Sequence, residues 1–351
     1  MSSPVHSLSP TDPLRPFFVD ERGLHVLDQR ALPHEERWLS FRADHDGLEG
    51  VANAIETLAV RGAPAIGGCA AAAVGVLAGA GATRDVLVGA IARLRRTRPT
   101  AVNLFFALDA VSAALDSGND AVVRAAATVI ADDARACQAM GDAGAALLND
   151  GDVVITICHT GAVATCGQGT ALGVVKSARV AGKDVAVVAL ETRPLWQGAR
   201  LTAWECQRAG IPVTLITDGM AAFALARGVV VGGAHRRIRR AFVGADRVAR
   251  NGDAANKIGT YNLAVACAAH GVPFHVVAPS STFDEACPDG DRIPIEERGA
   301  DEVRTPRGLA VAPRDVPVWN PAFDVTPARM IASWVTEAGA RQLVDGRVVP
   351  R

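Results

Sequence analysis

The sequence predicts an α/β fold, in which a Rossmann-like domain with a parallel sheet follows a smaller, mainly helical N-terminal domain with a short β start. Two observations lead to this prediction. From about residue 46 to residue 150 the chain is rich in alanine, and its apolar residues recur at i, i+3 and i+4, as in helices. After Gly151, short apolar runs alternate with amphipathic stretches, which is typical of a parallel sheet covered on both faces.

Five apolar runs are the predicted strands of this sheet. They begin about 30 residues apart, which leaves room for right-handed strand–helix–strand units. Near the end, Thr326 and Pro327 place a capping residue before a proline, which predicts a final helix. The runs are VVITI (153–157), DVAVVAL (184–190), PVTLIT (212–217), RAFVGA (240–245) and PFHVVA (273–278).

The first part of the chain predicts a hairpin and then helices. The segment FFVDERGLHVLDQRALP (17–33) has a turn at Glu21-Arg22-Gly23. The uncharged run 62–83 is mostly alanine and glycine, too weakly apolar for a membrane span, and predicts a buried helix. The opening segment has no apolar core, so we expect a flexible tail rather than a secretory signal. The predicted divisions are a tail at 1–16, a mainly helical domain at 17–125 and a Rossmann-like catalytic domain at 126–351.

Composition narrows the classes of function. The net charge is −1 with both signs mixed along the chain, which predicts neither nucleic acid nor membrane as a partner. Seven cysteines without a CxxC pair indicate reduced thiols and a cytoplasmic protein. No Cys/His pairs have ligand spacing, and no G-x-G-x-x-G or Walker motif is present, so we expect no metal and no nucleotide cofactor.

Polar residues follow each predicted strand, at the sheet edge where open α/β sheets bind ligands. Two readings of Cys158 stay open, namely core packing and a reactive thiolate favoured by helix dipoles. Asp246 is either a turn cap or an acid–base group. The residues at this edge include Cys158, His159, Thr160, Glu191, Gln197, Asp218, Asp246, Asn256 and Lys257.

Three cationic positions indicate an anionic ligand. Only three of the 36 lysines and arginines are lysine, and Lys257 lies at a predicted helix start, where a compact ammonium suits phosphate. Arg61 precedes a Gly-Pro turn that opens a helix, and Arg98 precedes a proline. Ordinary salt bridges are the alternative for each. A thiol and a carboxylate beside a small sugar phosphate suit proton transfer in an isomerisation.

Nine segments, in order over residues 27 to about 340, carry a family resemblance. They resemble the methylthioribose-1-phosphate isomerases, which are related to the regulatory subunits of the eukaryotic initiation-factor exchange complex. The segments are LDQRALP, VRGAPAIG, RPTAVNLFFALD, TGAVATCGQGTALGVV, ETRPLWQGARLTAWE, ITDGMAAF, VGADRVARNGDAANKIGTYNLAV, PIEER and VWNPAFDVTP.

The resemblance implies a cofactor-free homodimeric enzyme of methionine salvage. Such an enzyme converts 5-methylthioribose 1-phosphate, an aldose 1-phosphate, to 5-methylthioribulose 1-phosphate. The resemblance also implies that Cys158 and Asp246 are the catalytic pair. The substrate-binding residues that it implies are Arg61, Gly62, Ala63, Arg98, Gln197, Asn256 and Lys257.

One segment departs from the family pattern. The family usually reads His-Cys-Asn-Thr-Gly where this chain has Ile157, Cys158 and His159 before Thr-Gly. His159 is a possible modulator that lowers the thiol pKa as a cation or transfers the proton itself, and neutral drift is the alternative. Three other functions stay open: isomerisation of another 5-substituted or 5-deoxyribose 1-phosphate, isomerisation of ribose 1,5-bisphosphate, and a non-catalytic sugar-phosphate-sensing subunit.

Overall fold

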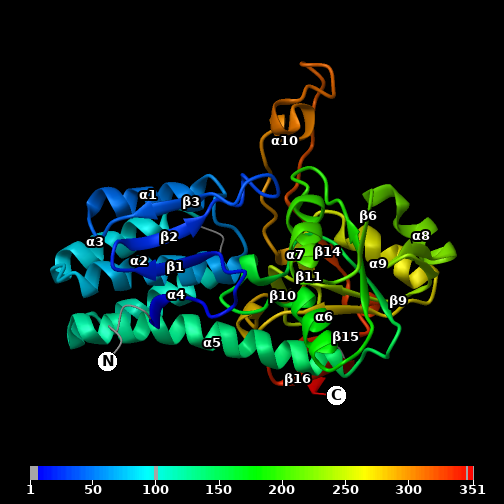
Figure 1. Cartoon of the computed structure of the whole chain (residues 1–351), viewed down its shortest axis with the longest axis horizontal. Coiled ribbons are helices and arrows are strands. Elements are labelled where there is room, and N and C mark those ends of the chain that lie inside the picture. Colours follow the sequence, from blue (N-terminus) through cyan, green and yellow to red (C-terminus); the bar gives the residue numbers. More distant parts are fainter. Residues whose placement is uncertain (1–6, 99–101, 345–346, 351) are drawn as a thin grey trace. The chain divides into compact units, whose positions relative to one another are not determined.

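The computed structural model describes residues 7–98, 102–344 and 347–350 of the chain (Figure 1). The chain divides into two compact units. The first comprises Met1–Gln138 and Thr160–Gly169, and the second comprises Ala139–His159 and Thr170–Arg351. The division at residues 125 and 126 that we predicted falls inside helix α5 (Asn119–Ala145).

The first unit contains a three-stranded antiparallel sheet and helices. The predicted hairpin is confirmed, because β1 (Phe17–Asp20) pairs with β2 (Gly23–Leu27). The sequence did not reveal β3 (Trp38–Phe41), whose four residues are too few for a clear alternating pattern and which pairs with β2. The helices are α1 (His45–Glu56), α2 (Ala63–Gly79), α3 (Arg84–Arg95), α4 (Val102–Ala113) and much of α5.

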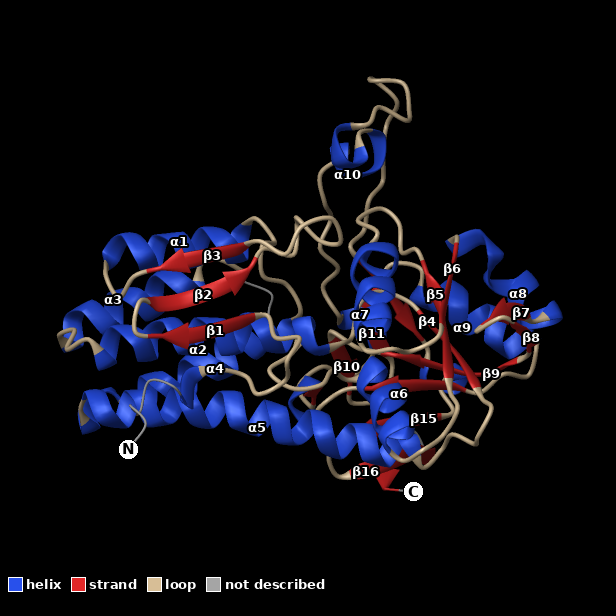
Figure 2. Ribbon diagram, viewed as in Figure 1, coloured by secondary structure: helices blue, strands red, loops and turns tan. Residues whose placement is uncertain are grey.

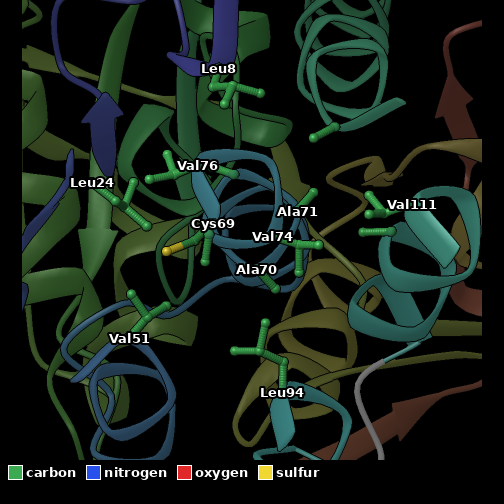
Figure 3. Packing of buried hydrophobic residues seen from close by; sticks show 14 of the residues in the cluster. Leu8, Leu24, Val51, Cys69, Ala70, Ala71, Val74, Val76, Leu94 and Val111 are labelled. Atoms are coloured by element: carbon green, nitrogen blue, oxygen red, sulfur yellow. The ribbon is translucent and has the colours of Figure 1, made fainter. Parts of the chain in front are cut away.

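Helix α2 is the centre of the first unit's core, so the prediction of a buried helix is confirmed. Its small side chains let neighbouring elements approach closely on all sides. Among the described residues, no helix is long and apolar enough to cross a membrane. Figure 3 shows Cys69, Ala70, Ala71, Val74 and Val76 of α2 with Leu8, Leu24, Val51, Leu94 and Val111 around them.

Part of the predicted N-terminal tail is packed. Residues 1–6 lie outside the described residues. Leu8, however, is fully buried in the core of the first unit, and the backbone N–H of Val19 donates to the Ser9 hydroxyl at 2.8 Å. The tail prediction therefore needs correction over residues 7–16, because the buried Leu8 and the hydrogen bonds of Ser9 and Pro16 to the hairpin hold this polar segment against the core.

The second unit is built on an eight-stranded sheet, in the order β17-β16-β15-β12-β9-β4-β5-β6. All five predicted strands are confirmed, and their pairs are parallel. A sixth parallel strand, β15 (Ser333–Thr336), follows β12, and an antiparallel hairpin of β16 (Gly339–Val344) and β17 (Arg347–Pro350) ends the sheet. The predicted strands are β4 (Val153–Thr156), β5 (Ala186–Leu190), β6 (Val213–Ile216), β9 (Ile238–Val243) and β12 (Phe274–Val277).

Helices cover both faces of this sheet, as Figure 2 shows. Helices α6 (Ala171–Val180) and α7 (Ala203–Arg208) lie on one side, and α8 (Ala221–Arg227) and α9 (Thr260–Ala269) lie on the other. The side chains of α8 and α9 share one apolar core with β4, β5 and β9. This layering explains why the strands are apolar at nearly every position.

The prediction of a final helix after Pro327 is wrong. Among the described residues, no α-helix follows Pro327. A single 3₁₀ turn (Ala328–Met330) leads into β15, because the residues of β15 are buried and pair with β12, which outweighs the local capping signal. The remaining elements are a four-stranded sheet of β13 (Phe283–Asp284), β10 (Arg247–Ala249), β11 (Ala254–Lys257) and β14 (Phe323–Thr326), the hairpin of β7 (Val229–Val231) and β8 (Ala234–Arg236), and helix α10 (Asp301–Arg304).

Candidate active site

Cys158 and Asp246 follow neighbouring strands of the large sheet. Cys158 comes just after β4 and Asp246 just after β9, and these two strands pair in parallel. From β4 the sheet continues through β5 and β6 on one side, and from β9 through β12 and β15 on the other. The strand order therefore reverses between β4 and β9, and open α/β sheets bind ligands at such a point.

The backbone of Cys158 is held in an unfavourable conformation. Its φ of 66° lies in the left-handed region, which costs a residue with a side chain about 1–2 kcal/mol. Two threonines fix it. The Cys158 N–H donates to Thr192 Oγ1 at 2.9 Å, and the Thr202 hydroxyl donates to the Cys158 carbonyl at 2.7 Å. Strain that the surroundings hold in place in this manner is concentrated at functional sites.

Thr192 is itself held by Asp218. Thr192 has a φ of 67°, and its N–H and that of Arg193 donate to the Asp218 carboxylate at 2.8 and 2.7 Å. The Thr192 hydroxyl donates to the Leu190 carbonyl at 3.0 Å, so its oxygen lone pairs are left to accept the Cys158 N–H. Asp218, which we expected at this edge of the sheet, therefore fixes the turn that supports Cys158.

Gln197 presents a buried amide oxygen. The residue is 5% exposed, and its Oε1 has no hydrogen-bond partner among the described residues. A buried polar atom without a partner is costly, and a bound ligand that donates a hydrogen bond removes that cost. The next residue, Gly198, packs so closely that a Cβ atom there would lie 1.7 Å from the Leu190 carbonyl oxygen.

His159 is buried in a cluster of charged residues. Its Nε2 lies 3.1 Å from Glu205 Oε2, and Lys176 Nζ lies 2.8 Å from the other oxygen of the same carboxylate. Burial alone would raise the pKa of Glu205, but Lys176 and His159 lower it to about 2. Ile157, the second departure from the family pattern, is buried in the apolar core that contains α8 and α9.

Asn256 and Lys257 lie on a strand, not at the helix start that we predicted. They end β11, which pairs with β14, and α9 begins only at Thr260, after the left-handed Gly259. Lys257 Nζ donates to the Ala322 carbonyl at 2.7 Å and lies 4.5 Å from the centre of the Phe323 ring.

The buried ammonium of Lys257 is therefore oriented by a carbonyl and an aromatic face. The amide of the neighbouring Asn256 donates to the Thr260 hydroxyl at 3.1 Å, which orients its side chain toward the start of α9.

Asp324 is an acidic residue that the sequence did not single out. Its carboxylate accepts the N–H groups of Gly259 and Tyr261 at 2.7 and 3.0 Å, and so caps α9 from the neighbouring strand β14. Burial raises the pKa of Asp324 to about 6, although those two N–H groups and Lys257 act in the opposite direction. Because the capping residue lies far along the chain from the helix, no local motif signals it.

Asp246 lies at the start of the β10–β11 hairpin. Its N–H donates to the Ala255 carbonyl at 2.8 Å, which ties its backbone to the strand that carries Asn256 and Lys257, while its side chain is partly exposed. In the part of the chain that the structure describes, no three His, Cys, Asp or Glu residues are grouped to hold a metal ion.

Four predicted substrate-binding residues lie in the first unit. Arg61 and Gly62 precede α2, which begins at Ala63 with a proline in its first turn, so the predicted helix start is confirmed. Gly62 has a φ of 99°, and a Cβ atom there would lie 2.4 Å from the Ala164 carbonyl oxygen. Arg98 is partly exposed and lies three residues after the end of α3 at Arg95. The other predicted site residues, among them Gln197, lie in the second unit.

The sequence and the fold together define the class of protein. The chain belongs to the initiation factor 2 subunit family, whose model matches residues 59–342.

The resemblance to the methylthioribose-1-phosphate isomerases is also confirmed. The chain is 51% identical to the methylthioribose-1-phosphate isomerase of Anaeromyxobacter sp. (strain K), over 93% of this chain and 94% of that protein. It is 46% identical to the enzyme of that name from Citrobacter koseri, over 92% of each chain.

Two crystal structures are similar along nearly the whole chain. The 5-methylthioribose 1-phosphate isomerase of Pyrococcus horikoshii has a TM-score of 0.84 at 38% identity and covers 95% of this chain and 93% of its own. The eIF-2B subunit delta of A. fulgidus has a TM-score of 0.82 at 39% identity and covers 94% of this chain and 96% of its own. Both similarities confirm the mixed α/β fold.

Proposed function

We propose that this protein is an aldose–ketose isomerase that converts 5-methylthioribose 1-phosphate to 5-methylthioribulose 1-phosphate in methionine salvage. The observation that carries the proposal is the sequence identity of 46–51%, over 92–93% of the chain, to relatives that bear this enzyme's name. The structural similarities alone support two functions, because one of the two neighbours is an isomerase and the other an initiation-factor subunit. The arrangement of Cys158 and Asp246 at the switch point favours the enzyme.

In the proposed reaction Asp246 is the general acid. A 1-phosphate prevents ordinary opening of the sugar ring to an aldehyde, so the ring oxygen must be protonated while its bond to C1 breaks. That step leaves an oxocarbenium-like phosphate ester at C1. The backbone hydrogen bond from Asp246 to β11, the strand that ends in Lys257, supports this role, because it joins the proposed acid to the strand that carries the proposed phosphate ligand.

Cys158 is the proposed base for the next step. The thiolate removes the proton from C2, whose electron pair forms the C1=C2 double bond of an enol. Reprotonation at C1 and loss of the proton from the C2 hydroxyl give the ketone, so protons and electrons balance over the cycle. A hydride shift from C2 to C1 is the alternative route. Reaction in D₂O distinguishes the routes, because the enol route can incorporate deuterium at C1 and a hydride shift cannot.

The buried Gln197 amide and the Lys257 ammonium are the proposed substrate ligands of the second unit. Gln197 Oε1 would accept a sugar hydroxyl, and Lys257 would pair with the phosphate as a compact donor. Arg61, Gly62, Ala63 and Arg98 are the proposed ligands of the first unit, where the start of α2 offers backbone N–H groups to an anion.

Substitution of the catalytic pair tests these roles. Cys158→Ser and Asp246→Asn should each lower kcat by about 10²- to 10⁴-fold, the usual contribution of an acid or a base. Turnover is measured by phosphorus NMR, and circular dichroism verifies that both variants are folded. A near-normal rate in either folded variant would refute the role of that residue.

A second candidate keeps the reaction and changes the sugar. His159 and Ile157 replace residues usual in the family, and this departure favours a relative that acts on another 5-substituted or 5-deoxyribose 1-phosphate. Both side chains are buried, so their influence on the sugar would be indirect.

We also infer a cytoplasmic homodimer. None of the seven cysteines, all of which the structure describes, forms a disulfide. Between Glu297 and Pro321 the chain exposes Leu309, Val311 and Trp319, with Trp319 81% exposed, and exposed apolar side chains of this kind mark interfaces. Light scattering that gave the mass of a single chain would refute the dimer.

A further inference from the structure

A network of five polar side chains connects a buried ion pair to the backbone of Cys158. It runs from Lys176 on α6 and Glu205 on α7 through His159 and Thr202 to the Cys158 carbonyl. Thr192 holds the N–H of the same residue. The Glu205 and His159 side chains are fully buried, so water does not screen their interaction.

The donors and acceptors in this network determine where the protons lie. The Cys158 carbonyl oxygen can only accept a hydrogen bond. The Thr202 hydroxyl therefore donates its single hydrogen to that oxygen, at 2.7 Å. His159 Nδ1 lies 3.1 Å from the same hydroxyl oxygen, which is left only as an acceptor, so Nδ1 carries a hydrogen.

The second ring nitrogen of His159 faces an anion. Glu205 Oε2 lies 3.1 Å from Nε2, and the carboxylate, ionised and paired with Lys176, can only accept. This contact has an ion-pair distance without the alignment of a hydrogen bond, but a bare nitrogen lone pair so close to a carboxylate would be repelled, so Nε2 also carries a hydrogen. The neighbouring thiol of Cys206 adds no charge, because burial, together with Glu205, raises its pKa to about 12.

We propose that His159 is held as an imidazolium by Glu205 and that, through Thr202, it positions Cys158 for catalysis. A neutral imidazole with a bare Nδ1 would attract the Thr202 hydrogen to itself, and the Cys158 carbonyl would lose its donor. The charge on His159 thus keeps the hydroxyl directed at Cys158 and sustains the left-handed conformation. The proposal rests on the proposed function for the role of Cys158, and it makes His159, Thr202 and Glu205 positioning residues that do not touch the substrate.

Thr202 provides the kinetic test. Thr202→Val removes the hydroxyl at nearly constant volume, and we expect kcat to fall by about 10- to 100-fold with KM changed less than about threefold, because the thiol is misplaced and not the binding groups. Thr202→Ser restores the hydroxyl and should return kcat to within about threefold of the unmodified protein.

Thr214→Val is the matched control. The Thr214 hydroxyl also donates to a backbone carbonyl, that of Val230 at 2.6 Å, but on the exposed side of β6. This variant should leave kcat unchanged. A folded Thr202→Val variant with the kcat of the unmodified protein, or one that Thr202→Ser does not rescue, would overturn the positioning role.

Nitrogen NMR of the full chain labelled with ¹⁵N-histidine tests the charge state without substrate. The His159 signals are assigned by their loss in His159→Gln. We expect both ring nitrogens to be protonated from pH 6 to pH 9, and one of them to lose its proton near neutral pH in Glu205→Gln. A neutral His159 ring at pH 7 in the unmodified protein would overturn the proposal even if Glu205→Gln does not fold.

The kinetic test and the NMR test together distinguish a failure of this inference from a failure of the proposed function. If the unmodified protein turns over no sugar phosphate, the proposed function fails, whereas the NMR result still decides whether His159 is charged. If Cys158→Ser retains activity, the positioning of Cys158 has no catalytic purpose and the proposal fails together with that assignment.

Discussion

Cys158 is the one cysteine among seven whose side chain is not buried. The thiols of Cys69, Cys137 and Cys166 lie in the first unit, where burial raises their pKa values, that of Cys69 to about 12 and those of Cys137 and Cys166 further still, so they are unreactive near neutral pH. A partly exposed thiol outside any disulfide, at a ligand-binding edge, is the expected setting of a reactive cysteine.

Alkylation should therefore be selective. We expect iodoacetamide to modify one thiol per folded chain, at Cys158, with activity lost in proportion to the modification. Peptide mass spectrometry locates the adduct, and Cys158→Ser is the control that should remain unmodified. Earlier modification of a buried cysteine, or full activity after Cys158 is alkylated, would contradict the assigned role.

Glu205 makes a pH-dependent contribution to stability. Its pKa is lowered from 4.5 to about 2 in the folded protein, so its contribution is present above pH 4.5 and is lost as the pH falls toward 2. A shift of this size corresponds to about 3 kcal/mol in the free energy of unfolding.

We expect Glu205→Gln to be less stable than the unmodified protein at pH 6, and the difference to shrink by about 3 kcal/mol between pH 5 and pH 2. Urea unfolding at a series of pH values measures it. A difference that stays constant with pH would show that Glu205 does not titrate as an ion-paired group.

Some of the site residues follow from sequence and others do not. Cys158, Asp246 and Gln197 were predicted at one edge of the sheet because they follow strands whose carboxyl ends meet there, and their roles were predicted from the family resemblance. Thr202 and Glu205 were missed because their roles depend on contacts between residues more than 40 positions apart, such as Thr202 with Cys158, separated by 44.

At the scale of elements, the turn after β5 is tightly constrained. Gly198 is the first residue of a short π-helix (Gly198–Thr202) that ends at Thr202, the residue hydrogen-bonded to Cys158. Gly198 itself lies against the end of β5. Only a residue without a Cβ atom fits there.

Gly198→Ala should accordingly destabilise the fold by more than about 3 kcal/mol, because the new methyl group would overlap the Leu190 carbonyl. Thermal unfolding measures the effect. Gly219→Ala is the matched control, since a Cβ atom there meets nothing within 4 Å, and its stability should change by less than about 0.5 kcal/mol. Equal stability of the two variants would contradict the close packing of Gly198.

The sequence predicted elements best where a pattern was long or strongly apolar. β4, β5, β12 and α2 are almost entirely buried, so nearly every residue in them carries the signal, whereas the edge strand β6 was recognised by its apolar run although most of its residues are only partly buried. β11 was taken for a helix start because its four residues precede a real helix, and β15 was taken for a helix because a capping residue and a proline precede it. In both cases the residues form a strand because they pair with a strand that is distant in sequence, β11 with β14 and β15 with β12.

At the scale of the whole molecule, the sequence predicted two parts but not their bounds. Helix α5 continues past the end of the first unit at Gln138, and the short segment Thr160–Gly169 belongs to the first unit although its neighbours in sequence belong to the second. Contacts of this segment explain the assignment: the Cys166 N–H donates to Asp133 at 2.6 Å, and the Gln29 amide donates to the Val163 carbonyl at 2.8 Å. No local sequence pattern predicts contacts between residues that lie so far apart in the chain.

The most direct measurement of the central claim is kcat/KM for the 1-phosphates of 5-methylthioribose, 5-deoxyribose and ribose, followed in parallel by phosphorus NMR. We predict conversion of 5-methylthioribose 1-phosphate to its ketose 1-phosphate with the highest kcat/KM of the three. A higher kcat/KM for another sugar would contradict the proposed substrate and favour the second candidate. No conversion of any of the three would contradict the isomerase function itself.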